Sequence, residues 1–141
     1  MTKILVIEDE AGIRMTLSLM LKAEGFDVTA AENGRAGVEA ARAQTPDLIL
    51  CDVNMPEMDG FGVLEQLRRE PALAATPFVF LTARIDRSDM RRGMNLGADD
   101  YLTKPFTRDE LMETVNARIK KHETSLEVLT NQLIASSETL R

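Results

Sequence analysis

The feature of this sequence that most constrains its fold is a regular alternation between short apolar runs and segments with helical spacing. Residues 4–7, 48–51 and 78–81 are continuous runs of mainly Ile, Leu, Val and Phe, as expected for strands buried on both faces of a parallel sheet. Residues 26–30 alternate between apolar and polar, and residues 101–102 form a shorter apolar patch, which indicates two outer strands. We therefore expect five strands.

Each of these runs is followed by a segment in which apolar residues recur three or four positions apart, the period of an amphipathic helix. Strict alternation of strands and helices predicts a parallel sheet with right-handed crossovers and helices on both faces, a three-layer α/β sandwich. The apolar positions of the five expected helices are Ile13, Leu17, Met20 and Leu21; Val38 and Ala41; Phe61, Leu64 and Leu67; Met90 and Met94; and Leu111, Val115 and Ile119.

The length of the chain limits the number of domains. A chain of 141 residues with 44% hydrophobic residues can bury one core but is too short for two full domains. We expect one domain over residues 1–121, with residues 122–141 as a helical extension. The formal charge of -6 argues against direct nucleic-acid binding, which needs a basic surface. We interpret residues 84–92, where four Arg face two Asp, as a solvated helix face.

The C-terminal segment lacks residues that break helices. No Gly or Pro lies between Thr107 and Arg141, so one helix of 35 residues is possible, about 50 Å long at 1.5 Å per residue. We predict a coiled coil that mediates homodimerisation, or a linker to an output region. The alternative is a frayed, partly disordered end. Apolar residues recur alternately three and four apart, with His122 and Ser136 as the two polar exceptions, at Val115, Ile119, Leu126, Leu129, Leu133 and Leu140.

Several classes of protein are disfavoured by what the sequence lacks. The single cysteine, Cys51, cannot form an intrachain disulfide, and His122, the only histidine, cannot build a zinc site of the His/Cys type. No apolar run approaches the roughly 18 residues that a membrane helix requires, and the N-terminal apolar run is too short for a signal peptide. We therefore expect a cytoplasmic protein without membrane contact.

Polar residues follow the predicted strands at the points where those strands end. Glu8 and Asp9 follow the first strand, Asp52 the third, Thr82 the fourth and Lys104 the fifth. The carboxyl ends of parallel strands lie along one edge of a sheet, where ligands bind at the point of strand-order reversal. In a flavodoxin-like (βα)5 sandwich with order 2-1-3-4-5, strands one and three are neighbours there. We therefore expect these five residues to converge.

Three carboxylates in one crevice repel each other, and a hard divalent cation relieves this repulsion. Mg²⁺ is held by a few carboxylates together with water and phosphate oxygens. Asp9 and Asp52 can supply side-chain oxygens, Glu8 can act directly or through water, and the carbonyl of Asn54 can complete the shell. The sequence thus predicts a magnesium site at this edge of the sheet.

A site of this kind suits phosphoryl transfer, because positioning and charge stabilisation supply most of that catalysis. The Asp52 carboxylate would attack phosphorus in line and form an acyl phosphate. Lys104 would neutralise one phosphoryl oxygen, and the Thr82 hydroxyl would donate a hydrogen bond to another. Each residue alone is better explained as a helix cap, a strand end or a surface charge. Their joint placement at one edge favours the functional interpretation. Cys51 is interpreted as a packing residue.

With these features the sequence resembles the receiver domain of bacterial two-component response regulators, in the CheY-like family. The resemblance covers residues 3 to about 121 and rests on IEDE, DLILCDVNMPEMDG, FLTA and GADDYLTKPF, in this order and spacing. It implies that Asp52 is the phosphoacceptor and that a sensor histidine kinase or phosphotransfer protein is the donor. It also implies that Mg²⁺ binds Glu8, Asp9, Asp52 and the Asn54 carbonyl, with Thr82 and Lys104 contacting the phosphoryl group.

The resemblance also implies how a signal leaves the site. Once the phosphoryl group is bound, Thr82 moves toward it and Tyr101 swings inward, so that the surface of the fourth helix, fifth strand and fifth helix changes. A cis peptide bond between Lys104 and Pro105 is implied as well. Such a domain is not an enzyme in the ordinary sense, since it catalyses only its own phosphorylation and dephosphorylation. We further hypothesise that Arg84 shields the phosphoryl group from water.

Two other functions compete with this interpretation. A phosphatase of the haloacid-dehalogenase type also combines a nucleophilic Asp with Thr or Ser and Lys. It needs a carboxylic acid two residues after the nucleophile, where this chain has Asn54, which cannot exchange a proton. A docking module with a degenerate pocket is the second alternative, and the intact set of Asp9, Asp52, Thr82 and Lys104 argues against it.

Overall fold

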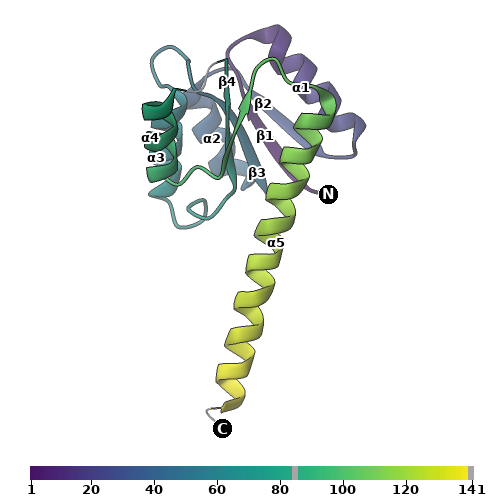
Figure 1. The fold of residues 1–141 in the computed structure, drawn as a ribbon, viewed down its shortest axis with the longest axis vertical. Helices are drawn as coiled ribbons and strands as arrows, with labels where there is room; N and C mark the ends of the chain where they lie inside the picture. The colour runs from purple at the N-terminus through teal and green to yellow at the C-terminus, as the bar shows by residue number, and fades with distance from the viewer. Residues whose placement is uncertain (84–85, 140–141) are drawn as a thin grey trace.

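The computed structural model describes residues 1–83 and 86–139, so Arg84 and Leu140 lie outside the described residues. Five parallel strands form one sheet in the order β2-β1-β3-β4-β5, which confirms the predicted fold class (Figure 1). The elements are β1 (Lys3–Ile7), α1 (Ala11–Ala23), β2 (Asp27–Ala31), α2 (Gly34–Gln44), β3 (Leu48–Asp52), α3 (Gly60–Arg68), β4 (Phe78–Thr82), α4 (Arg87–Asn95), β5 (Asp100–Thr103) and α5 (Arg108–Thr139).

Helices cover both faces of the sheet, because successive strand residues point to opposite sides. Leu5 and Ile7 of β1 belong to a core cluster that includes buried side chains of α2 and α3. Ile4 and Val6 belong to a second cluster that includes buried side chains of α1 and α5. The central strands β3 and β4 are buried along their whole length, which explains their uninterrupted apolar sequences.

The register of the strands aligns their carboxyl ends. Ile7 pairs with Cys51, so Glu8 follows its strand beside Asp52. Asp52 in turn pairs with Leu81, the residue before Thr82. The residues that end β1, β3 and β4 therefore meet at one edge of the sheet, as predicted.

The fourth helix forms where expected but buries a different face from the one that its methionines suggested. Met90 and Met94 are 38% and 51% exposed, whereas Gly93 is the buried residue of α4. A Cβ atom on Gly93 would lie 2.0 Å from the hydroxyl oxygen of Tyr101 and 2.8 Å from the ring of Phe80. The aromatic rings of β4 and β5 thus reach the helix backbone, and only glycine allows this approach.

The long fifth helix is also present. It begins at a capping box, in which the Glu110 backbone N–H donates to the Thr107 hydroxyl (3.1 Å) and the Thr107 backbone N–H donates to the Glu110 carboxylate (3.2 Å). The helix then continues without interruption past the sheet (Figure 1). Ile119 still packs against the core. The division into a domain of residues 1–121 and an extension of residues 122–141 remains a prediction.

The extension exposes much of its apolar surface. Leu126, Leu129 and Leu133 are 50%, 55% and 71% exposed. These are the positions that the sequence assigned to a coiled coil, while the side chain of Ser136 lies outside the described residues. Among the described residues, none of the helices combines the length and the apolar character needed to cross a bilayer.

Candidate functional site

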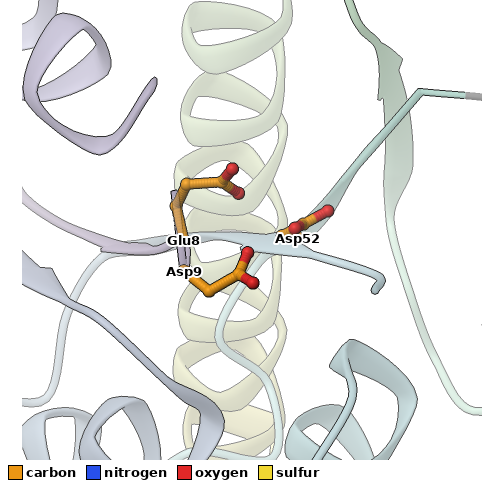
Figure 2. A group of neighbouring side chains, drawn as sticks. All are labelled: Glu8, Asp9 and Asp52. Atoms are coloured by element: carbon orange, nitrogen blue, oxygen red, sulfur yellow. The ribbon is translucent and has the colours of Figure 1, made fainter. Parts of the chain in front are cut away.

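Three carboxylates meet at the carboxyl edge of the sheet. Glu8 and Asp9 follow β1, and Asp52 is the last residue of β3. One oxygen from each of these side chains lies within 4.8 Å of the other two (Figure 2). Glu8 and Asp52 are buried, whereas Asp9 is exposed. The structure therefore brings together the predicted metal-binding side chains and leaves one of them open to solvent.

A single lysine spans two of these carboxylates. The Lys104 ammonium donates a hydrogen bond to Glu8 Oε1 at 2.9 Å and lies 3.5 Å from Asp52 Oδ1. Its side chain is 16% exposed, so both ion pairs are largely shielded from water. The next peptide bond, between Lys104 and Pro105, is cis, the isomer that the resemblance implies. Lys104 is thus placed to contact a group bound to Asp52.

The other predicted residues occupy different parts of this edge. Thr82, the last residue of β4, is buried and lies one position beyond the pairing of Leu81 with Asp52. Asn54 lies in the loop after β3 and is exposed. Tyr101 lies apart from the carboxylates, where its ring packs on Phe80 with a centroid distance of 5.2 Å. Its hydroxyl donates to the carbonyl of Asp89 in α4 at 2.8 Å.

Burial raises the pKa of both buried carboxyls. Burial raises the pKa of Glu8 to about 7, and the hydrogen bond from Lys104 offsets only part of this rise. Burial also raises the pKa of Asp52, with the positive charge of Lys104 opposing it. For Lys104, burial lowers the pKa, but the hydrogen bond to Glu8 and the charge of Asp52 prevail and the pKa is raised. Both carboxyls therefore hold a proton to higher pH than usual unless a cation compensates their charge.

The residues fit a hard divalent cation. With all three carboxylates ionised and Lys104 protonated, the cluster has two unbalanced negative charges. Within the part of the chain that the structure describes, the buried Oε2 atom of Glu8 has no hydrogen-bond partner. An unpaired buried carboxylate oxygen is costly unless a cation or water contacts it. Mg²⁺ matches both the charge and the all-oxygen donor set.

Cys51 plays no part in this chemistry. Its side chain is fully buried, and burial raises the pKa of its thiol well above the usual value. A thiol that remains protonated and inaccessible cannot act as a nucleophile or metal ligand. This supports the interpretation of Cys51 as a packing residue.

Sequence reasoning missed Gly93 as the point where α4 approaches Tyr101. Its backbone lies against the Tyr101 hydroxyl, and Arg92, its neighbour in α4, stacks over the Phe61 ring at 4.5 Å from the ring centroid. An isolated glycine inside a helical pattern was the available signal, because such a glycine often marks a close approach. The sequence could not indicate which side chain approaches it.

Comparisons with known proteins agree with this geometry. The sequence model of the family "response regulator receiver domain" matches residues 4–116 of this chain. A probable transcriptional regulator, ycf27 from Porphyridium aerugineum, is 40% identical over 119 residues, which are 84% of this chain and 48% of that protein. The chain spans about half the length of the curated relatives it matches.

Two solved structures are similar over nearly their whole length. The chemotaxis protein CheY4 of Vibrio cholerae has a TM-score of 0.82 and 32% identity, covering 84% of this chain and 98% of that one. The receiver domain of the sensor histidine kinase PA1611 from Pseudomonas aeruginosa has a TM-score of 0.78 and 31% identity over the same shares, and holds a magnesium ion in its active-site cleft. This chain therefore belongs to the receiver-domain family of two-component response regulators.

Proposed function

We propose that Asp52 accepts a phosphoryl group from a phosphohistidine of a sensor kinase or phosphotransfer protein. The observation that carries this proposal is the convergence of Glu8, Asp9 and Asp52 within 4.8 Å, with Lys104 at 2.9 Å from Glu8 and 3.5 Å from Asp52. Glu8, Asp9, Asp52 and the carbonyl of Asn54 would hold Mg²⁺. When bound, Mg²⁺ supplies charge stabilisation to the phosphoryl oxygens.

The chemistry at Asp52 is an in-line displacement. A carboxylate oxygen of Asp52 forms a bond to phosphorus while the bond from phosphorus to the histidine nitrogen breaks, and its electron pair returns to the imidazole. The Lys104 ammonium lies where it can neutralise an oxygen of the transferred group. The Thr82 hydroxyl, at the end of the neighbouring strand, donates to another. Later attack of water on phosphorus breaks the bond to the Asp52 oxygen, releases inorganic phosphate and returns Asp52 to its carboxylate.

Incubation with acetyl phosphate and Mg²⁺, followed by mass spectrometry, tests this proposal. We expect the mass of the intact chain to increase by one phosphoryl group, on Asp52. A phosphatase of the haloacid-dehalogenase type would instead turn over a generic phosphate ester repeatedly. Such turnover needs a carboxylic acid at the position where this chain has Asn54. A docking module would gain no mass, and that result would refute the proposal.

We infer that the phosphodonor docks in a groove beside Lys104. A cavity of about 590 Å³ lies between α1 and the loop from β5 to α5. Its lining is mainly apolar and includes Ile13, Leu17, Met20, Pro105 and Phe106. The groove also includes Lys104, which lies 3.5 Å from Asp52. An apolar groove beside this lysine suits the side of a helix whose histidine must reach Asp52.

Thr16 provides a test of this docking groove. Its side chain is exposed in the groove and bonds only to the carbonyl of Gly12 among the contacts that the structure gives it. We expect Thr16→Arg to slow phosphotransfer from the cognate kinase by roughly tenfold or more, since a bulky cation fills the contact centre. Labelling by acetyl phosphate should be unchanged. Thr124→Arg, at an exposed threonine with the same local bond in α5, is the control. Equal slowing in both variants would remove the groove from the mechanism.

We propose that phosphorylation changes the surface formed by α4, β5 and α5. Movement of Thr82 toward the phosphoryl group opens space for the Tyr101 ring. Inward movement of Tyr101 breaks its hydrogen bond to the Asp89 carbonyl, which holds α4 to β5. The contact between Thr82 and the phosphoryl group forms in only one of these two arrangements. Phosphorylation therefore shifts the population toward that arrangement. Partner binding then follows the phosphorylation state.

Homodimerisation through α5 is the second part of the proposed output. Leu126, Leu129 and Leu133 continue the spacing of the residues by which α5 packs on its own sheet, among them Leu111 and Val115. They therefore face the side on which the domain lies. A parallel second copy would place its own domain in this same space. An antiparallel copy instead brings its free helix end beneath the domain, so we propose antiparallel pairing.

Sedimentation tests this pairing. We expect the wild-type chain to sediment as a dimer and the double variant Leu129→Gln/Leu133→Gln as a monomer, because the change removes two apolar contacts per helix from the shared face. Val128→Gln is the matched control, since Val128 is 49% exposed but lies on another side of the helix. A monomeric wild-type chain, or dissociation caused equally by Val128→Gln, would contradict the proposal.

A further inference from the structure

Arg14 contacts the main chain of the metal site from outside it. This residue lies in the first turns of α1, and its side chain turns back toward β1. Its Nη1 atom donates a hydrogen bond to the carbonyl of Glu8 at 2.8 Å and lies 3.4 Å from the carbonyl of Asp9 in a second, weaker one. The residue is half-buried. One guanidinium nitrogen thus bridges the two successive peptides that carry the acidic pair.

These contacts fall where the chain has few other restraints. The residue before α1, Glu10, is extended and makes no side-chain hydrogen bond as an N-cap, and the first turn of α1 contains no acidic residue. On the other side, the Glu8 backbone N–H donates to the carbonyl of Ala31 in β2. The main chain of Glu8 is therefore held from both sides, whereas Asp9, the exposed ligand, is held by Arg14.

We propose that Arg14 is a positioning residue for the metal centre: it fixes the peptides of Glu8 and Asp9 so that both carboxylates face Asp52 in the geometry that Mg²⁺ requires. The inference rests on the magnesium site proposed above. Mg²⁺ accepts little deviation from octahedral coordination, whereas Ca²⁺ tolerates irregular oxygen shells. A looser loop therefore weakens Mg²⁺ binding more than Ca²⁺ binding.

If Arg14 acted only through its charge, its removal would strengthen Mg²⁺ binding instead of weakening it. Arg14 carries a positive charge close to the cation site, so its removal would strengthen the binding of any divalent cation if charge were its only influence. A purely structural role, in which Arg14 ties α1 to β1, would lower thermal stability without changing the preference for Mg²⁺ over Ca²⁺. The sign of the change in Mg²⁺ affinity and the Mg²⁺/Ca²⁺ ratio therefore separate the three roles.

The test measures dissociation constants for Mg²⁺ and Ca²⁺ by calorimetric titration of the full chain, without any phosphodonor. We expect Arg14→Ala to raise the Mg²⁺ dissociation constant by roughly tenfold or more, as is typical for residues that orient metal ligands, and to raise that for Ca²⁺ by less. Arg14→Lys retains one donor and should recover part of the Mg²⁺ affinity. Lys22→Ala, which removes an exposed cation from the last turn of the same helix, is the control.

The outcomes distinguish this inference from the function on which it rests. Unchanged or tighter Mg²⁺ binding by Arg14→Ala, with normal binding by the wild-type chain, overturns the role of Arg14 alone. Equal losses for Mg²⁺ and Ca²⁺ also overturn it. A wild-type chain that binds neither cation at millimolar concentration overturns the metal site and the role of Arg14 together. If Arg14→Ala does not fold, the same comparison is made between Arg14→Lys and the wild-type chain.

Discussion

We expect the replacement of Asp52 by Asn to abolish phosphorylation by acetyl phosphate and to make the metal-free protein more stable. The first effect follows because the amide has no nucleophilic carboxylate oxygen. The second follows because burial raises the pKa of Asp52, so the folded protein pays a desolvation and repulsion penalty for its charge at neutral pH. Asn occupies the same volume without that charge. We expect a higher melting temperature for Asp52→Asn than for the wild-type chain when no divalent cation is present.

We expect magnesium to reverse the order of stabilities. Asp52 supplies one of the clustered oxygens, so Asp52→Asn should weaken Mg²⁺ binding by at least roughly tenfold, and the stabilisation by Mg²⁺ falls accordingly. Thermal unfolding with and without Mg²⁺, together with intact mass after acetyl phosphate treatment, measures both effects. Asp27→Asn, at an exposed carboxylate of β2, is the control and should behave like the wild-type chain. A phosphorylated Asp52→Asn variant would show that the acceptor is another residue.

The second large effect that we expect is a loss of stability of the metal-free protein as pH rises. The pKa of Glu8 is about 7 in the folded chain and 4.5 ordinarily. Between these values the folded state binds more protons than the unfolded state, so the free energy of unfolding decreases with rising pH. The loss begins near the ordinary pKa and is complete above the folded pKa. The shift corresponds to about 3 kcal/mol, or roughly 10 °C in melting temperature for a domain of this size.

Thermal unfolding from pH 5 to pH 8 tests this expectation. The raised pKa of Lys104 does not contribute within this range, because its change lies above the ordinary value of 10.5. Glu8→Gln should flatten the profile, since the neutral side chain has no proton to release. Millimolar Mg²⁺ should restore stability mainly at pH 8, where Glu8 is ionised. A metal-free wild-type chain with the same melting temperature at both pH values would contradict the raised pKa of Glu8.

The prediction of the α4 face was less successful than that of the central strands, and the difference has a physical cause. A strand buried on both faces must be mainly apolar, so β3 and β4 can be recognised from their sequences. Two methionines four residues apart show only that an apolar stripe exists. They do not show whether a partner covers it, and in α4 the aromatic rings of Phe80 and Tyr101 take the inner side next to Gly93.

The sequence by itself determined the alternation of strands and helices, the parallel sheet and the set of polar residues at its carboxyl edge. These are local or periodic properties, because strand period, helix period and strand ends can be read from neighbouring residues. Only the tertiary structure decided which groups face each other: Lys104 meets Glu8 across 96 positions of the chain, and Arg14 turns back to the carbonyls of Glu8 and Asp9. Such contacts depend on how the crossovers place whole elements, and no local pattern encodes the resulting distances.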